Sequence, residues 1–196
     1  MRLRTKVALV FGLIALVATV SLTVVTYAFA RNSLLDQRID VARSQAIANA
    51  TRVRDQLRFG SADTIGDFFV SGQIRTDEDG FAFMRLSGEP GDVATTDSRV
   101  TEASFPLQLR ALAEQAGSGL QIYEIDGDSY LGAAIHIGEF DRTYYETFPL
   151  GPTERTLGAI LVALITGSVI TVLLAAAAGW WTSRRLLRPL DRITGV

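Results

Sequence analysis

Residues 7–30 read VALVFGLIALVATVSLTVVTYAFA, and this stretch decides the fold because it contains no charged residue. A helix rises about 1.5 Å per residue, so about 20 residues cover the roughly 30 Å hydrocarbon core of a bilayer. Residues 157–181, LGAILVALITGSVITVLLAAAAGWW, repeat the pattern and end in a tryptophan pair typical of a membrane interface. Backbone polar groups find no partners in lipid, so both stretches are predicted to be membrane-spanning helices.

Basic residues predict the orientation of these two helices. Seven of the 19 basic residues flank the spans on the side of the chain termini: Arg2, Arg4, Lys6, Arg184, Arg185, Arg188 and Arg192. The remaining 12 lie in residues 31–156 together with 20 of the 21 acidic residues, which gives this middle region a net charge near -8. Lysine and arginine favour the cytoplasmic side. We therefore expect a cell-membrane protein with residues 1–6 and 182–196 in the cytoplasm and residues 31–156 outside.

The N-terminus has a second interpretation as a cleaved signal peptide. Its basic start and the triplet Ala28-Phe29-Ala30 are compatible with a signal sequence and its cleavage site. The apolar stretch is longer than the roughly 7 to 15 residues of a signal peptide core. This length favours an uncleaved span, with the cleaved form as the alternative.

A long helix is predicted to follow the first span over residues 31–58. Its apolar residues recur at steps of three and four, as one helical stripe requires. They are Leu35, Ile39, Ala42, Ala46, Ala50, Val53 and Leu57. With no proline or glycine before Gly60, we expect one continuous helix that leaves the membrane.

Beyond Gly60, glycine, aspartate and proline separate short runs of aromatic and β-branched residues, which indicates strands. The expected strands cover residues 80–86, 93–96, 120–125, 129–137 and 143–150, with a turn at 87–92. Residues 105–116 have helical spacing and end at Gly117, a plausible helix cap. Asp126-Gly127 is a hairpin signal. Residues 60–150 are therefore predicted to form an α+β domain with an antiparallel sheet, and this element order resembles the PAS-like extracytoplasmic sensor domains of the Cache or PDC type.

The segment TSRRLLRPLDRITGV, residues 182–196, resembles the start of a HAMP linker. Arg184-Arg185 and Pro189 match the basic start and early proline of that family. Leu186, Leu190 and Ile193 have coiled-coil spacing, and proline disfavours regular helix, so we expect these residues and Pro189 to relay a signal. The resemblance implies a homodimer.

Together these features resemble the N-terminal part of a bacterial sensor histidine kinase of a two-component system. The resemblance implies that a kinase domain using ATP and magnesium, and phosphorylating a response regulator, lies in the parent protein beyond this chain. No cofactor is expected in this chain and no nucleic acid as partner, and whether the chain belongs to an enzyme depends on that missing part. The alternatives are a stand-alone or split membrane sensor that modulates a partner kinase, or the input half of a HAMP-containing cyclase or chemoreceptor.

Motifs for catalysis are lacking, and we expect no catalytic residue: there is no phosphate-binding loop and no zinc spacing, and the chain contains no cysteine. The only histidine, His136, is expected in an outward strand and so is not a phosphoacceptor. Residues 77–80, Asp-Glu-Asp-Gly, do not fit a calcium loop, since Arg75 and Leu86 would occupy ligand positions. We expect a solvated turn there and no metal site.

A sensor pocket on the sheet would take its polar groups from Arg85, Tyr123, Tyr130 and His136, which suit a small anionic ligand. The competing interpretation makes the tyrosines and the histidine core residues with a satisfied polar tip.

Three further patterns each have two interpretations. Arg142 with Tyr144 and Tyr145 is either part of this site or a membrane-proximal surface. Asn49-Ala50-Thr51 matches a glycosylation acceptor, although a bacterial protein would rarely use it. Small residues at spacing four in the second span are either a helix-packing face or the ordinary composition of such spans. They are Ala159, Ala163, Gly167, Ala175 and Gly179.

Overall fold

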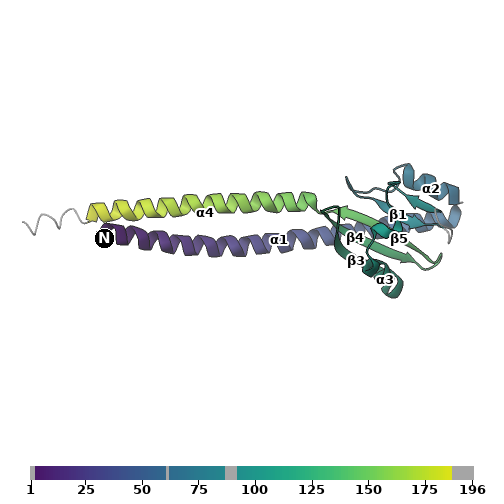
Figure 1. Ribbon diagram of the computed structural model, residues 1–196, viewed down its shortest axis with the longest axis horizontal. Coiled ribbons are helices and arrows are strands. Elements are labelled where there is room, and N and C mark those ends of the chain that lie inside the picture. The colour runs from purple at the N-terminus through teal and green to yellow at the C-terminus, as the bar shows by residue number, and fades with distance from the viewer. Residues whose placement is uncertain (1–2, 61, 87–91, 187–196) are drawn as a thin grey trace, which may run out of the picture. The chain divides into compact units, whose positions relative to one another are not determined.

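The computed structural model describes residues 3–60, 62–86 and 92–186. The chain divides into two compact units. One consists of the described parts of Met1–Ser33 and Arg155–Val196, and the other of Leu34–Glu154. Helix α1 (Leu3–Phe59) begins in the first unit and continues into the second, and α4 (Gly151–Leu186) begins in the last residues of the second unit and continues in the first (Figure 1).

The first unit contains the apolar parts of two helices that are long and apolar enough to cross a membrane, as the sequence predicts. The helical segments that meet this criterion are Leu9–Phe59 and Gly151–Thr182. Large apolar side chains stay exposed along both helices; Phe29, for example, is 76% exposed. Within this unit the hydroxyls of Thr23 and Ser168 lie 3.0 Å apart. Such a surface is stable in lipid and unfavourable in water.

The second unit contains the five-stranded antiparallel sheet that the sequence predicts. Its strands are β1 (Ala82–Arg85), β2 (Val93–Thr95), β3 (Ser118–Ile125), β4 (Asp128–Ile137) and β5 (Arg142–Pro149). Their order is β2-β1-β5-β4-β3, and every neighbouring pair is antiparallel. The last strand in sequence is thus central in the sheet, and it is also the strand that leads into α4.

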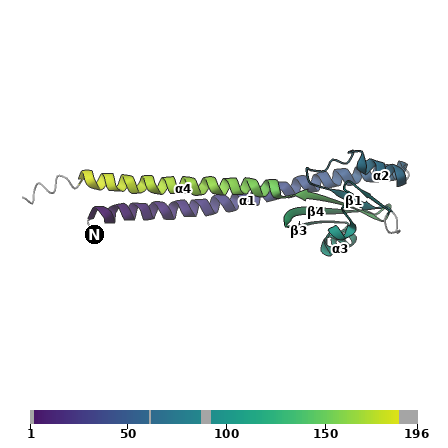
Figure 2. The ribbon, with the colours of Figure 1, turned by 45° about the horizontal axis from the view of Figure 1, so that its top comes forward.

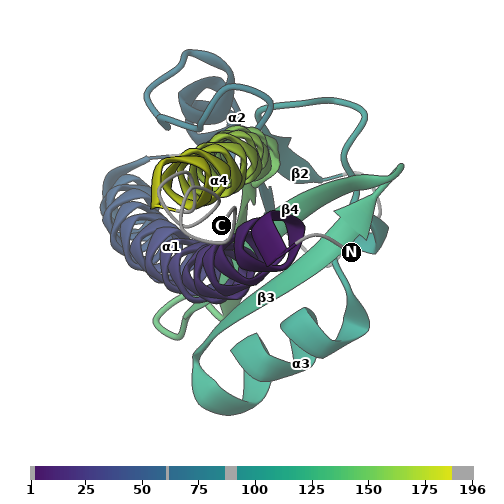
Figure 3. The same ribbon diagram turned by 90° about the vertical axis from the view of Figure 1, so that its left-hand side faces the viewer.

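Helices cover both faces of this sheet. The C-terminal part of α1 and α2 (Ala62–Val70) lie on one face, while α3 (Leu107–Ala116) lies on the other (Figures 2 and 3). The short 3-10 helix η1 (Glu102–Ser104) precedes α3. Since strand side chains alternate between the faces, each face has its own apolar core. We name these the α1 face and the α3 face.

Small side chains line the buried side of α1, and the predicted helical stripe is confirmed. Ala42, Ala46, Ala50 and Val53 are all at most 4% exposed. An alanine at every fourth position lets the helix backbone approach the sheet closely, because no large side chain separates them. The remaining members of the stripe are only partly buried at its two ends.

Helix α2 was not expected, since strands were predicted after Gly60. Its sequence ADTIGDFFV is too short for a clear helical period, but Ile65, Phe68 and Phe69 are spaced by three and one and are all buried. The predicted helix at 105–116 begins two residues later, at Leu107, and Phe105 is instead a buried core residue before it. Most of the predicted turn at 87–92 lies outside the described residues.

Backbone conformations at two turns agree with the sequence signals. Gly117 ends α3 with φ of 75°, in the left-handed region that glycine adopts without a steric penalty. Asp126 and Gly127 join β3 to β4 with φ values of 52° and 92°. Two positive φ values in a row are typical of a tight hairpin turn.

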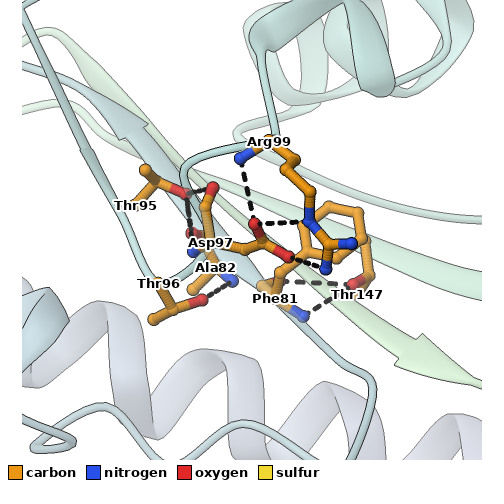
Figure 4. Close-up of polar contacts among 7 residues, drawn as sticks. All are labelled: Phe81, Ala82, Thr95, Thr96, Asp97, Arg99 and Thr147. Carbon is orange, nitrogen blue, oxygen red and sulfur yellow. Dashed lines mark hydrogen bonds and ion pairs between the residues drawn. The ribbon is translucent and has the colours of Figure 1, made fainter.

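Threonine hydroxyls complete the hydrogen bonding of β1 at its start. The amide of Phe81 donates to Thr147 Oγ1 at 3.0 Å, and the amide of Ala82 donates to Thr96 Oγ1 at 2.9 Å (Figure 4). Thr147 is fully buried on β5. These bonds satisfy backbone donors at the point where β1 enters the sheet between β2 and β5.

An aspartate turn follows β2. The carboxylate of Asp97 accepts hydrogen bonds from the backbone amide and the guanidinium of Arg99, at 2.9 Å and 2.8 Å (Figure 4). The side-chain bond from Arg99 lowers the pKa of Asp97 to about 2. Arg99 itself is highly exposed, so this ion pair is a local feature of the loop.

Candidate functional site

The four residues proposed for a ligand site all lie on the α3 face. Tyr123 of β3, Tyr130 and His136 of β4 and Arg85 of β1 alternate with residues whose side chains pack against α1. The same face holds Tyr145 of β5, which packs in one cluster with residues of α3. The alternation of side chains along the strands therefore correctly predicted that the four proposed residues lie on the same face of the sheet.

These residues do not come together, however, because they lie near opposite ends of the sheet. Tyr123 pairs with Tyr130, whereas His136 pairs with Thr143 on β5. Tyr130 and His136 are six residue steps apart on extended β4, a distance of about 20 Å at about 3.4 Å per residue. The candidates thus divide into a tyrosine group and a group near Arg85.

The tyrosine group has the character of a packed core. Tyr123 contacts the core cluster beneath α3, and burial raises the pKa of its hydroxyl. Within the described part of the chain that hydroxyl has no hydrogen-bond partner. The ring of Tyr130 lies 6.2 Å from that of Phe81. The core interpretation thus fits the ring of Tyr123 but not its polar tip, which has no partner among the described residues, and Tyr130 is only partly buried.

A pocket of about 410 Å³ lies at the other end of the α3 face. It is formed where the ends of β1 and β5, the turn between β4 and β5, η1 and α3 meet. Its lining residues are Arg85, Leu86, Glu102, Glu114, Phe140, Asp141, Arg142, Thr143 and Tyr145. Five of these nine carry a formal charge, so the pocket suits a small polar molecule better than an apolar one.

Glu102 of η1 binds two arginines in this region. It forms an ion pair with Arg85 and a second, longer contact of 3.5 Å with Arg110 of α3. The two pairs connect η1 to both the sheet and α3. One of the two arginines in the pocket wall is therefore already neutralised by a protein carboxylate.

Arg142 is the second arginine of the wall, and it lies at the start of β5. Its side chain is half-buried, and it forms no ion pair with a residue that the structure describes. A guanidinium is always charged and offers a planar array of donors that matches carboxylate and phosphate groups. Arg142 is thus the cation of this pocket that is available to a ligand.

Two further side chains border the pocket. Tyr145 is 5% exposed and stacks on Phe105 with ring centroids 4.7 Å apart, and burial raises the pKa of its hydroxyl. Thr143 Oγ1 lies 3.3 Å from Nδ1 of His136. His136 therefore contacts a residue of the pocket wall, while its Nε2 lies 3.8 Å from the exposed carboxylate of Asp141.

The alternative interpretation of residues 142–145 as a membrane-proximal surface is wrong for its tyrosines. Tyr144 is fully buried on the α1 face and Tyr145 is buried on the α3 face. Both stand in a central strand, where each face is covered by a helix. A run of consecutive aromatic residues fits a strand buried on both sides.

Most of the pocket was missed in the sequence because its parts are distant along the chain. Glu102 and Glu114 come from segments with no visible polar motif, and Asp141 with Thr143 flank a turn. Arg142 is the one local signal that points to the site, because it is a charged residue at the start of a strand that contains three aromatic residues.

The structure also shows where several other residues from the sequence analysis lie. Asn49 is 1% exposed, so it is not accessible as a glycosylation acceptor in the folded domain. Asp77, in the acidic turn, forms an ion pair with Arg38 of α1. Within the first unit Gly12 and Ala176 lie in contact between α1 and α4. Of the predicted packing residues, Ala175 is partly buried and Gly179 is buried, whereas Ala159, Ala163 and Gly167 are exposed.

The predicted relay residues cannot be placed. Helix α4 ends at Leu186, whose side chain is not described, and Pro189, Leu190 and Ile193 lie outside the described residues.

No protein-family model, curated protein or solved structure matches this chain.

Proposed function

We propose that this chain is the signal-input part of a bacterial sensor histidine kinase, held in the cell membrane by α1 and α4 with the second unit outside. The parent kinase would use ATP and magnesium and would phosphorylate a response regulator. In this proposal the second unit is a PAS-like sensor domain of the Cache type. Support for that type comes from its central β5, its antiparallel sheet and the long helix across one face.

The observation on which the proposal rests is the continuity of β5 with α4. Thr143 and Tyr145 of β5 line the pocket, β5 ends at Pro149, and α4 begins at Gly151. Only Leu150, itself buried, separates the strand from the helix. A ligand that displaces β5 would therefore move the start of an apolar helix without an intervening flexible linker.

The second path to the membrane is α1. It packs its alanine stripe on the α1 face of the same sheet and continues as one helix into its apolar N-terminal part. A receptor needs an element whose two arrangements a ligand favours unequally. We propose that this element is the pair α1 and α4, whose relative shift a HAMP linker and its Pro189 hinge would pass to the kinase in a homodimer.

The proposed ligand class rests on Arg142 alone, since the pocket lining also holds three carboxylates, those of Glu102, Glu114 and Asp141. Arg142 is a cation without a carboxylate partner among the described residues, while Arg85 is shared with Glu102. We propose a small anion, a carboxylate or phosphate, that binds Arg142 and competes with Glu102 for Arg85. Such competition would couple ligand binding to the position of η1 and of β1.

The topology is tested with a reporter enzyme that is active only outside the cytoplasm. Inserted after Gly127, an exposed position in the β3–β4 turn, it should be active, and fused after Val196 it should be silent. A fluorescent protein that matures only in the cytoplasm should give the opposite pattern. Reversed results with both reporters would refute the proposed orientation.

The ligand class is tested by thermal unfolding of the full chain in lipid nanodiscs with inorganic phosphate, sulfate and small di- and tricarboxylates. We expect at least one anion to raise the melting temperature, and Arg142→Ala to abolish the shift. Arg99→Ala is the matched control, because Arg99 is an exposed arginine whose partner is Asp97. Equal shifts in both variants, or no shift with any anion, would exclude an anion site at Arg142.

A further inference from the structure

Glu146 is a carboxyl group in the middle of β5 that has no access to solvent. Its exposed fraction is 0%, and its neighbours across the sheet are Ala82 of β1 and Ala133 of β4. It lies on the α1 face, opposite to the pocket side of the sheet. Buried carboxylates normally have a cationic partner, because the loss of hydration is costly for a charge.

The groups that bind Glu146 are neutral donors. Asn49 Nδ2 lies 3.0 and 3.1 Å from its two oxygens, and Gln45 Nε2 lies 3.1 Å from Oε1. The hydroxyl of Tyr144 donates to Oε2 at 2.9 Å. Asn49 and Gln45 stand one helical turn apart on α1, so α1 and β5 share this carboxyl group.

The charged groups around this cluster are few and are engaged elsewhere. Asp77, in the segment before β1, is a like charge that is held by Arg38. Arg52 of α1 donates to Asn49 Oδ1 at 3.0 Å rather than to Glu146. The neighbours that β1, β4 and α2 contribute are apolar. No cation among the described residues forms an ion pair with Glu146.

Two opposing effects act on its protonation. Burial raises the pKa of Glu146, and the three donors lower it; burial is the larger effect, so the pKa lies above that of an ordinary glutamate. A neutral acid in this site would also need an acceptor for its own proton, which the amide nitrogens of Asn49 and Gln45 cannot provide and which the Tyr144 hydroxyl can provide only by reversing its hydrogen bond. The charged and neutral forms therefore need different arrangements of the side chains of α1 and β5.

The same donors tie a third segment to the cluster. Gln45 Nε2 and Asn49 Nδ2 also donate to the backbone carbonyl of Arg75, at 2.9 Å and 3.1 Å. A change at Glu146 would thus reach α1, β5 and the segment that leads into β1.

We propose that Glu146 is a proton-binding switch at the contact between α1 and β5, through which the domain responds to acid conditions. On acidification Glu146 takes one proton from solvent and becomes a neutral acid, and its hydrogen bonds to Asn49 and Gln45 rearrange. That the sensed acidity is extracytoplasmic rests on the proposed function; the protonation itself does not depend on it. The reporter fusions test the orientation and the titration below tests the switch, so the two fail separately.

The switch is tested by infrared difference spectroscopy of the full chain in lipid nanodiscs during a pH titration. We expect a neutral carboxylic acid signal that appears at a pH above the ordinary value for glutamate, about 4.3. Glu146→Gln should remove this signal. Glu139→Gln is the matched control, because Glu139 is exposed, bound by Arg58 and has a lowered pKa. A wild-type spectrum without such a signal, or one that persists in Glu146→Gln, would overturn the proposal.

A second variant keeps the carboxyl group and so remains informative if Glu146→Gln fails to fold. Tyr144→Phe removes one donor to the charged form, so the midpoint of the titration should move to higher pH. The side-chain amide resonances of Asn49 should shift with the same midpoint in nuclear magnetic resonance spectra, which a buried group without influence on α1 would not cause. An unchanged midpoint in Tyr144→Phe, or an Asn49 amide that does not titrate, would contradict the switch.

Discussion

Gly132 of β4 lies directly against the ring of Tyr123 on the neighbouring strand, so closely that a Cβ atom at Gly132 would lie 2.5 Å from Tyr123 Cε1. The same Cβ would lie 2.8 Å from Cδ2 of Leu109 in α3. Gly132 thus permits α3 to pack on the sheet. We predict that Gly132→Ala destabilises the domain by about 1–3 kcal/mol, as overpacking of a filled core does, measured by chemical unfolding of the full chain in detergent micelles.

Gly66→Ala is the control for this prediction. Gly66 lies inside α2, and its added Cβ would meet no atom within 4 Å. Alanine favours helix over glycine by about 1 kcal/mol, so this variant should be as stable as the native chain or more stable. If Gly132→Ala were also neutral, the close packing of α3 on β4 would be incorrect.

The hydroxyl of Tyr123 gives the second prediction. It is buried without a partner among the described residues, whereas the hydroxyl of Tyr144 is buried and donates to Glu146. Tyr123→Phe should therefore stabilise the domain by about 1 kcal/mol, and Tyr144→Phe should destabilise it by about 1–3 kcal/mol at neutral pH. Thermal unfolding of the two variants side by side measures the difference in sign. Destabilisation by both would indicate that the hydroxyl of Tyr123 has a partner.

The third prediction concerns the contact between α1 and α4 in the first unit. The Cβ of a residue replacing Gly12 would lie 3.8 Å from Cβ of Ala176, which is the usual Cβ separation in a disulfide. Since the chain has no cysteine, Gly12→Cys with Ala176→Cys should form one intramolecular disulfide under mild oxidation. A mobility shift on a non-reducing gel that reverses with reductant measures it.

The pair Gly12→Cys with Gly167→Cys is the matched control, because no atom lies within 4 Å of a Cβ built at Gly167. It should stay reduced within one chain. Efficient cross-linking of the control and not of the first pair would show that α4 presents its other side to α1.

The sequence predicted those parts of the fold that depend on periodicity. The two apolar helices, the stripe on α1 and the alternating strands each bury or expose one side with a regular period, so a single segment reveals them. The turn at Asp126-Gly127 and the helix end at Gly117 could also be predicted, since their positive φ values favour particular residue types. The short helix α2 was missed because nine residues hold too few turns to show a period.

The candidate site was less predictable for a different reason. The alternation of side chains along the strands predicts that Arg85 and His136 share a face of the sheet. Their distance from Tyr123, however, depends on the strand register and on the position of β5 between β1 and β4. Neither is visible in a local stretch. The network of Gln45, Asn49 and Glu146 joins residues about 100 positions apart, and only folding brings them together.

The last prediction tests how closely α1 approaches the sheet, on which the signalling path through α1 and the Glu146 switch both depend. Ala46 is 1% exposed and lies one residue from Gln45, on the buried side of the helix, whereas Ala48 is exposed. Leucine at position 46 would force α1 away from the sheet and disturb the hydrogen bonds of Gln45 and Asn49 to Glu146. Ala46→Leu should therefore cost about 1–3 kcal/mol in unfolding free energy, while Ala48→Leu should stay within about 0.5 kcal/mol of the native value. A displaced α1 would admit water to Glu146, which lowers its pKa, and would weaken two of its hydrogen bonds, which raises it. Because burial is the largest of the effects on this pKa, the carboxylic acid signal of Ala46→Leu should titrate at lower pH than in the native chain. An Ala46→Leu variant with native stability and an unchanged titration would mean that α1 is not in close contact with β5.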